Sequence, residues 1–189
     1  MSDKTLVLSL ARLPRALGST LHEDLVWVTP DDLGTPSMSA VPGVPLDISV
    51  DMTSVEDGVL VSLATSVDLV GECVRCLDEV REHHDVVSQE VYFEPGAPVL
   101  TSADDEGEEA DDLFVIGERD TICIETQLRD AIVPLVDPRP LCSDDCAGLC
   151  DVCGEKWVDL PEDHEHFVVD PRLASLASLL GEDGESERS

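Results

Sequence analysis

Zinc-ligating side chains are concentrated in one stretch of the sequence, residues 141–170. Four of the seven cysteines lie there in the pattern C-x3-C-x3-C-x2-C, and two histidines follow. Thiolate sulfur and neutral imidazole nitrogen are preferred zinc ligands, and a structural site takes four of them in a tetrahedron. Gly154, after the last cysteine, lets backbone amides turn in toward the thiolates. The pattern predicts a zinc knuckle whose candidate ligands are Cys142, Cys146, Cys150, Cys153, His164 and His166.

A second C-x-x-C motif, formed by Cys73 and Cys76, lies between two stretches of strand-like sequence. It has three interpretations: it completes a metal site with the later cysteines, it is a redox dithiol, or it has no special role. A thioredoxin-like dithiol follows a strand and opens a helix. Both flanks are strand-like here, which argues against redox catalysis. We therefore add Cys73 and Cys76 to the pool of candidate metal ligands.

These eight side chains are enough for one structural zinc site or two. One possible division pairs the Cys73 motif with Cys150 and Cys153, which leaves Cys142 and Cys146 with the two histidines; the spacing does not fix this pairing. Reduced cysteines without a metal and disulfides are the alternatives. Disulfides require an oxidising compartment. The N-terminal sequence has no secretory signal pattern, and seven is an odd number of cysteines for a disulfide framework.

The charge of the chain is its most unusual property. Its 189 residues include 42 acidic and 11 basic side chains, for a net charge of −31. Such a chain repels phosphate backbones, so we expect no broad electrostatic binding of RNA or DNA. The charge favours a basic partner, and ribosomal proteins are abundant examples. The alternative is that acidity serves only solubility or reflects an adaptation of the whole proteome.

The length predicts one domain, or one domain with a small appendage, and hydropathy predicts a soluble, cytoplasmic protein. No apolar run approaches the ~18 residues that a membrane span needs. Apolar residues make up 42% of the chain but aromatic residues only 3%, so the core should consist mainly of Val, Leu, Ile and Ala. Residues 94–112 contain an acidic block, DDEGEEADD, whose only apolar side chain is that of Ala110, which predicts a disordered insertion.

Alternating apolar and polar residues predict a long antiparallel β-structure in the first half of the chain. Residues 46–52 and 59–70 alternate and flank a turn at residues 56–58. Residues 80–93 then return as a further strand, with a shift of pattern near Val87 that predicts a β-bulge. The Cys73 motif therefore lies at the end of a hairpin.

Shorter elements surround this hairpin. Strands are predicted at residues 5–10, 25–28 and 121–124, with a connecting loop over residues 29–45. Cys123, in the last of these strands, is expected to be a small core residue. A short amphipathic helix is predicted at residues 125–133, ending before Pro134. A second helix is predicted at residues 172–180, after an Asp-Pro start and before Gly181.

Together these elements predict a β-rich α+β fold: a twisted antiparallel sheet or partly open barrel with short helices and a C-terminal Cys/His zinc knuckle. Residues 1–93 form the N-terminal part of one domain, and residues 94–112 form the acidic insertion. Residues 113–180 form the C-terminal part with the helix, the knuckle and the closing helix. Residues 181–189 form a disordered tail.

Four motifs resemble the YceD family, whose members are called large ribosomal RNA subunit accumulation proteins. They are CVRCLDEV (73–80), ETQLRDAIVPLVDPRPLC (125–142), CAGLCDVCG (146–154) and DPRLASLASL (170–179). The resemblance covers residues 70–189. It implies a role in the synthesis, processing or stability of 23S rRNA, and hence in large-subunit assembly. In many bacterial relatives the knuckle ends in Cys-x-Cys, and His164-Glu165-His166 holds that place here.

Three functions follow as hypotheses. The first is a non-enzymatic ribosome-assembly factor that binds a basic ribosomal protein or a pre-50S particle and contacts rRNA only indirectly. The second is a zinc-stabilised nucleic-acid-binding module, which would need a basic surface. The third is a nuclease or thiol oxidoreductase. No nucleophile–base pairing is recognisable, so we predict no enzyme activity, no catalytic residues and no small-molecule substrate.

Overall fold

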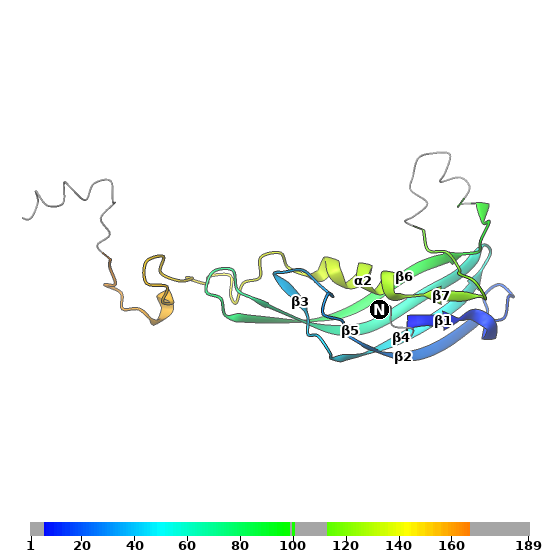
Figure 1. Ribbon diagram of the computed structural model, residues 1–189, viewed down its shortest axis with the longest axis horizontal. Helices are drawn as coiled ribbons and strands as arrows, with labels where there is room; N and C mark the ends of the chain where they lie inside the picture. The colour runs from blue at the N-terminus through cyan, green and yellow to red at the C-terminus, as the bar shows by residue number, and fades with distance from the viewer. Residues whose placement is uncertain (1–5, 99, 101–112, 167–189) are drawn as a thin grey trace, which may run out of the picture. The chain divides into compact units, whose positions relative to one another are not determined.

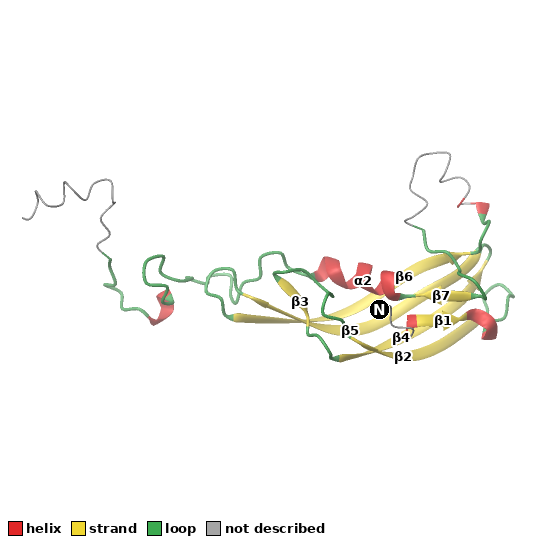
Figure 2. Cartoon of the chain, viewed as in Figure 1, coloured by secondary structure: helices red, strands yellow, loops and turns green. Residues whose placement is uncertain are grey.

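The computed structural model describes residues 6–98, 100 and 113–166, and its contacts divide the chain into two compact units, residues 1–144 and 145–189. Each unit is described by itself. The first unit is β-rich, as predicted, and contains one α-helix among the described residues (Figures 1 and 2). Its elements are β1 (Val7–Ser9), β2 (Thr20–Val28), β3 (Met38–Ala40), β4 (Pro45–Val55), β5 (Gly58–Glu72), β6 (Glu79–Phe93), β7 (Thr121–Cys123) and α2 (Glu125–Ile132).

A five-stranded antiparallel sheet forms the body of this unit. β5 is the central strand: it pairs with β6 along its whole length, and on its other side with β4 and β3. β2 pairs with β4. A two-residue turn joins β4 to β5, and a six-residue loop, residues 73–78, joins β5 to β6. The sheet is open: the described strands do not close into a barrel.

The hydrophobic core lies on one face of this sheet. Alternate residues of β4 and β5 are buried there, as the period-two sequence pattern predicts. β1 and β7 pair as a separate two-stranded sheet, and the hydroxyl of Tyr92 in β6 donates to the carbonyl of Cys123 in β7 at 3.2 Å. The buried side chains are mostly Leu, Val, Ile and Met, with Trp27 and Tyr92 as large aromatic members. The expectation of an aliphatic core is confirmed.

Helix α2 packs on the same face. Leu128 and Ile132, one turn apart, are fully buried, and Pro134 follows the helix in a 3-10 turn. Between α2 and the sheet, the amide nitrogen of Gln127 donates to the carbonyl of Val61 at 3.1 Å and to the hydroxyl of Ser88 at 3.3 Å. These two bonds connect the helix to both β5 and β6.

Several sequence-based predictions need correction. The β5–β6 register runs without interruption from Gly58↔Phe93 to Glu72↔Glu79, so the bulge predicted near Val87 is wrong. Cys123 is exposed rather than part of the core, because Ile122 takes the buried position of β7. The predicted loop of residues 29–45 contains the short strand β3. β2 also begins five residues earlier than predicted, at Thr20.

Other predictions fall outside the described residues. They are the closing helix at residues 172–180, the tail at 181–189 and most of the acidic insertion, of which only residues 94–98 and 100 are described. The boundary between the two units, after Asp144, falls inside the predicted C-terminal part, residues 113–180. None of the described helices has the length and apolar character needed to cross a membrane.

Candidate metal centres

The eight candidate ligands gather into two groups of four. Within each group, the potential ligand atoms all lie within 4.8 Å of one another. Cluster A consists of Cys73, Cys76, Cys142 and Cys146. Cluster B consists of Cys150, Cys153, His164 and His166. The division suggested from the sequence, in which the Cys73 motif joined Cys150 and Cys153, is therefore wrong.

Backbone contacts explain why the Cys73 motif meets Cys142. The motif lies in the loop between β5 and β6, so both of its cysteines sit at the end of the hairpin, as predicted. The amide of Val74 donates to the carbonyl of Pro140 at 3.0 Å. This bond holds the proline-containing arm after α2 against the hairpin end, two residues before Cys142. Tertiary hydrogen bonding, rather than sequence spacing, thus brings Cys142 next to the Cys73 motif.

The two C-x-x-C loops have the same backbone geometry. In cluster A, the amide of Cys73 donates to the carbonyl of Asp78 at 2.7 Å, and the amide of Leu77 donates back to Cys73 at 2.9 Å. In cluster B, the amide of Cys150 donates to the carbonyl of Glu155 at 2.7 Å, and the amide of Gly154 donates to the carbonyl of Cys150 at 2.9 Å. The residue after the second cysteine has a positive φ in both loops, 63° for Leu77 and 75° for Gly154.

This shared loop directs amides toward sulfur. Backbone N–H groups of Cys142, Arg75 and Cys76 donate to the sulfur of Cys73, and they lower its pKa to about 6. In cluster B, the amides of Cys153 and Val152 lower the pKa of Cys150 in the same way. The thiolate is the form of cysteine that binds metal. Both loops therefore favour the ligand form of their first cysteine.

Ligand distances agree with a tetrahedral site. The sulfurs of Cys76 and Cys142 lie 3.5 Å apart, and the sulfur of Cys153 lies 3.6 Å from Nε2 of His164. With Zn–S bonds of about 2.3 Å, two sulfurs on one zinc would be separated by about 3.8 Å. A disulfide would require about 2.0 Å, which is much shorter than the 3.5 Å between the sulfurs of Cys76 and Cys142. Both clusters could hold a metal ion.

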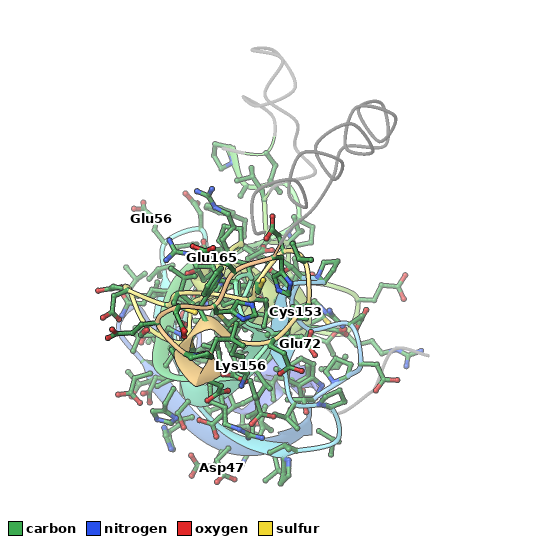
Figure 3. All side chains as sticks on the ribbon, turned by 90° about the vertical axis from the view of Figure 1, so that its left-hand side faces the viewer. Asp47, Glu56, Glu72, Cys153, Lys156 and Glu165 are labelled. Carbon is green, nitrogen blue, oxygen red and sulfur yellow. The ribbon has the colours of Figure 1, made fainter. Side chains whose placement is uncertain are left out.

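The two clusters differ in burial and in donor type. Cluster A has four sulfur donors, and Cys73 and Cys76 are buried. Cluster B has two sulfurs and two imidazoles, and only Cys150 is buried. Its imidazoles lie edge to face, with ring centroids 4.4 Å apart, and Trp157 packs edge-on against His164 at 5.6 Å. Cys153, the exposed sulfur candidate of cluster B, and Lys156 of the same loop are labelled in Figure 3.

Sequence reasoning found all eight candidate ligands but missed two supporting residues. Leu77 occupies the left-handed position that Gly154 occupies in the other loop. No sequence signal marks it, because leucine seldom adopts this conformation. Trp157 lies four residues after Cys153, and its contact with His164 depends on how the chain folds back.

Both clusters lie inside the stretch that matches a known family. The family model described as "Large ribosomal RNA subunit accumulation protein YceD" matches residues 61–180. The chain belongs to the YceD family. The resemblance stated from the sequence motifs is thereby confirmed. The family's name implies a role in the accumulation of large ribosomal subunit RNA.

Mycobacterial relatives extend this similarity along the chain. The chain is 32% identical over 183 residues to an uncharacterized protein of Mycobacterium tuberculosis, which covers 97% of this chain and 85% of the relative. An uncharacterized protein of Mycobacterium bovis gives the same values. One of Mycobacterium leprae is 33% identical over 143 residues, covering 75% of this chain and 62% of the relative. No solved structure matches the chain.

Proposed function

We propose that this protein is a non-catalytic assembly factor for the large ribosomal subunit, which supports the synthesis, processing or stability of 23S rRNA in the cytoplasm. The observation that carries the proposal is the family match over residues 61–180. Clusters A and B each bind one structural zinc ion in this proposal. Bound zinc supplies no reaction chemistry; it fixes the two C-x-x-C loops in one conformation.

The proposed partner is a basic protein of the large subunit, bound alone or within a pre-50S particle. The net charge of −31 supports a basic partner, because opposite charge accelerates association and selects against acidic surfaces. Acidic side chains project from the sheet unit into solvent, as Figure 3 shows for the labelled Asp47 and Glu56. Contact with rRNA is then indirect, through the bound protein.

Ion pairing of the arginines supports a protein partner over naked RNA. Several arginines of the described ranges already contact carboxylates, which reduces the positive charge they offer to phosphate. These pairs are Arg12 with Glu23, Arg15 with Glu94 and Asp120, Arg81 with Glu79, and Arg129 with Asp32 and Glu125. The alternative function, a zinc-stabilised nucleic-acid-binding module, would need a basic surface that these pairs do not provide.

Depletion of the protein in its own host tests this proposal. We expect the ratio of 23S to 16S rRNA to fall and precursor particles of the large subunit to accumulate. The tagged full-length protein should sediment with those precursors at low salt and leave them at high salt, because charge attraction is screened. An unchanged rRNA ratio after complete depletion would overturn the proposal.

Two further assays separate the competing functions. Purified protein incubated with precursor 23S rRNA should leave the RNA length unchanged; shortening of the RNA would indicate a nuclease. A filter-binding titration with naked rRNA should show no salt-sensitive binding below micromolar concentrations. Tight, salt-sensitive binding would favour the nucleic-acid-binding module instead.

A further inference from the structure

Strand β6 is a long edge strand whose outer side is almost unpaired. It spans Glu79–Phe93 and pairs with β5 on one side only. Among the described residues, its other side contacts backbone solely at the end, where a parallel bridge joins Phe93 to Val115. An unpaired edge presents N–H and C=O groups that can pair with another chain.

Hydrogen bonds at both ends of the hairpin show which backbone groups face outward. The amide of Cys73 donates to the carbonyl of Asp78, and the amide of Glu94 donates to the carbonyl of Asp57. Asp78 and Glu94, which directly precede and follow β6, are both even-numbered, so the even-numbered residues of this strand make the bonds toward β5. In an antiparallel ladder, alternate residues direct both N–H and C=O to the same side. Since the register is uninterrupted, the odd-numbered residues face the free edge: Glu79, Arg81, His83, Asp85, Val87, Gln89 and Val91.

The end of the strand confirms that the odd-numbered residues of β6 face the free edge. Phe93 is also odd-numbered, and its amide donates to the carbonyl of Phe114 at 2.8 Å while its carbonyl accepts from Ile116 at 2.9 Å. Residues 114–116 thus already pair with the outer side of β6 for a short distance. The edge has the geometry to accept a strand, and from Glu79 to Val91 no residue in the described part of the chain pairs with it.

The edge lacks most of the features that keep edge strands from pairing. β6 contains no proline, no lysine and no bulge. Its side chains facing solvent include Val87, which is 72% exposed. The charged residues of the strand are mainly acidic, with Glu82, Asp85 and Glu90 in addition to Glu79, and its one arginine, Arg81, is paired with Glu79 at 2.7 Å.

These features select one class of occupant. A second copy of this chain would place acidic residues opposite acidic residues, which destabilises a strand pair. RNA cannot pair with backbone N–H and C=O groups in a strand ladder. An extended, basic protein segment satisfies both the open hydrogen-bonding groups and the acidic flanks, in the manner of β-strand addition.

We propose that the free edge of β6, from Glu79 to Val91, binds an extended basic segment of a partner protein, which adds to the sheet as a further strand. The identification of that partner as a large-subunit protein rests on the proposed function. The binding mode itself rests on the outward N–H and C=O groups of the odd-numbered residues, on the unpaired edge and on the acidic side chains of β6.

A pair of proline variants tests the edge directly. Val87→Pro removes one outward N–H of β6 and leaves the β5–β6 hydrogen bonds intact, because Val87 lies opposite Ala64 of β5 but directs its N–H to the free edge. Val26→Pro is the matched control on the other edge strand, β2. Val26 is also an exposed valine, at 57%, and its N–H also faces outward, since the odd-numbered Thr29 and Ser19 make the bonds to Val44 and Ser54 across the pair. Proline is tolerated at such edge positions.

The probe is a synthetic peptide of about ten alternating Val and Lys residues, measured by fluorescence anisotropy against the full-length protein at low salt. We expect Val87→Pro to weaken binding about tenfold or more, because it removes a hydrogen bond and places a ring in the path of the strand. Val26→Pro should bind as the wild type does. The same peptide N-methylated at alternate residues keeps its charge but cannot pair, and it should not bind measurably.

Hydrogen exchange with the peptide bound gives a second readout. The amides of the odd-numbered residues 81–91 should become protected, whereas those of β2 should not change. Equal binding of the N-methylated peptide would reduce the interaction to charge attraction and overturn the proposal. Loss of binding in Val26→Pro but not in Val87→Pro would move the site to β2 and would also overturn it.

The edge and the proposed function can fail independently. If Val87→Pro still sediments with large-subunit precursors, and the peptide results are negative, the edge inference is wrong while the assembly role stands. If depletion leaves rRNA unchanged but the peptide pairs with β6, the edge binds a basic partner outside ribosome assembly.

Discussion

At the scale of single residues, the cysteines of this chain fall into two kinds. Cys73 is fully buried and receives backbone N–H groups at its sulfur, and its pKa falls to about 6. Cys123 is exposed at the end of β7 and belongs to neither cluster. The two residues are both cysteines in the sequence, but the backbone N–H groups around Cys73 favour its thiolate form, and Cys123 has no such cluster around it among the described residues.

Replacement of one cluster cysteine should remove one metal ion. We expect the wild-type protein to carry two zinc ions per chain by elemental analysis, and Cys142→Ser to carry one, because the Cys142 sulfur lies 3.5 Å from that of Cys76 in cluster A. Cys123→Ser is the matched control and should keep both. A zinc content that Cys142→Ser leaves unaltered would show that cluster A holds no metal.

His83 illustrates a titrating contact on the exposed face of the sheet. It lies opposite Asp68 in the β5–β6 register, with Nδ1 2.6 Å from the carboxylate, and Asp85 lies 3.8 Å from Nε2. The hydrogen bond to Asp68 raises the pKa of His83 above 6.5. The folded state therefore binds this proton more tightly than the unfolded state does.

This raised pKa predicts a pH-dependent contribution to stability. The contribution of protonated His83 is fully present below its unfolded pKa of about 6.5 and disappears as the pH rises through the higher folded value. We expect His83→Gln to lower the thermal midpoint at about pH 5.5 and to have little effect at about pH 8.5. Asp68→Asn should reproduce the loss, and adding it to His83→Gln should cause no further loss. A deficit that is constant across this range would contradict the mechanism.

At the scale of elements, the same loop occurs at two distant places in the chain. Each C-x-x-C loop closes with the same two backbone bonds and the same positive φ after its second cysteine. The first loop joins the two longest strands of the sheet, so fixing it also fixes the end of the β5–β6 hairpin. The loops differ in the residue at the strained position, leucine in one and glycine in the other.

Substitutions at this position should have opposite effects. A left-handed backbone costs an ordinary L-residue about 1 kcal/mol, whereas asparagine tolerates it better. Because the Leu77 side chain is 61% exposed, Leu77→Asn should lose little burial and raise the free energy of unfolding by about 0.5 kcal/mol.

Gly154→Ala should instead weaken its loop by about 1 kcal/mol. Chemical denaturation of the zinc-loaded protein measures the Leu77 effect, and competition with a chromogenic chelator measures the Gly154 effect as weaker zinc retention. If both substitutions were neutral, the positive φ would carry no strain.

At the scale of the whole molecule, two different sources of order are combined. The sheet unit has a hydrophobic core formed mainly by β4, β5, β6 and α2. Among the described residues of the C-terminal unit, only Gly148 and Cys150 are buried, and the single helical segment is a 3-10 turn at Trp157–Asp159. A segment with so little core is expected to gain order when its candidate ligands hold a metal ion, as the proposed zinc sites require.

Metal removal should therefore affect the molecule unevenly. With a strong chelator, we expect faster hydrogen exchange in residues 145–166 and in the loop of residues 73–78, whereas β4 and the middle of β5 should remain protected by the core. Addition of zinc should restore the original exchange. If the chelated protein kept both its exchange pattern and its thermal midpoint, the metal would have no structural role.

The sequence by itself determined features that depend on local chemistry. Alternation of apolar residues predicted β4, β5 and β6, because burial on one face of a strand requires period two. Pro134 marked the end of α2, because proline cannot continue a helix. Ligand chemistry and spacing identified all eight members of the two clusters, and the motifs around them indicated the family.

Only the tertiary structure decided how these parts combine. The bond from Val74 to Pro140 holds the arm that carries Cys142 beside the Cys73 motif, and the eight candidate ligands fall into two sets. Packing of Ile122 left Cys123 exposed, and the uninterrupted ladder replaced the predicted bulge. The open edge of β6 likewise follows from strand order. Each of these outcomes depends on contacts between residues far apart in the sequence, whereas spacing and periodicity report only on neighbours.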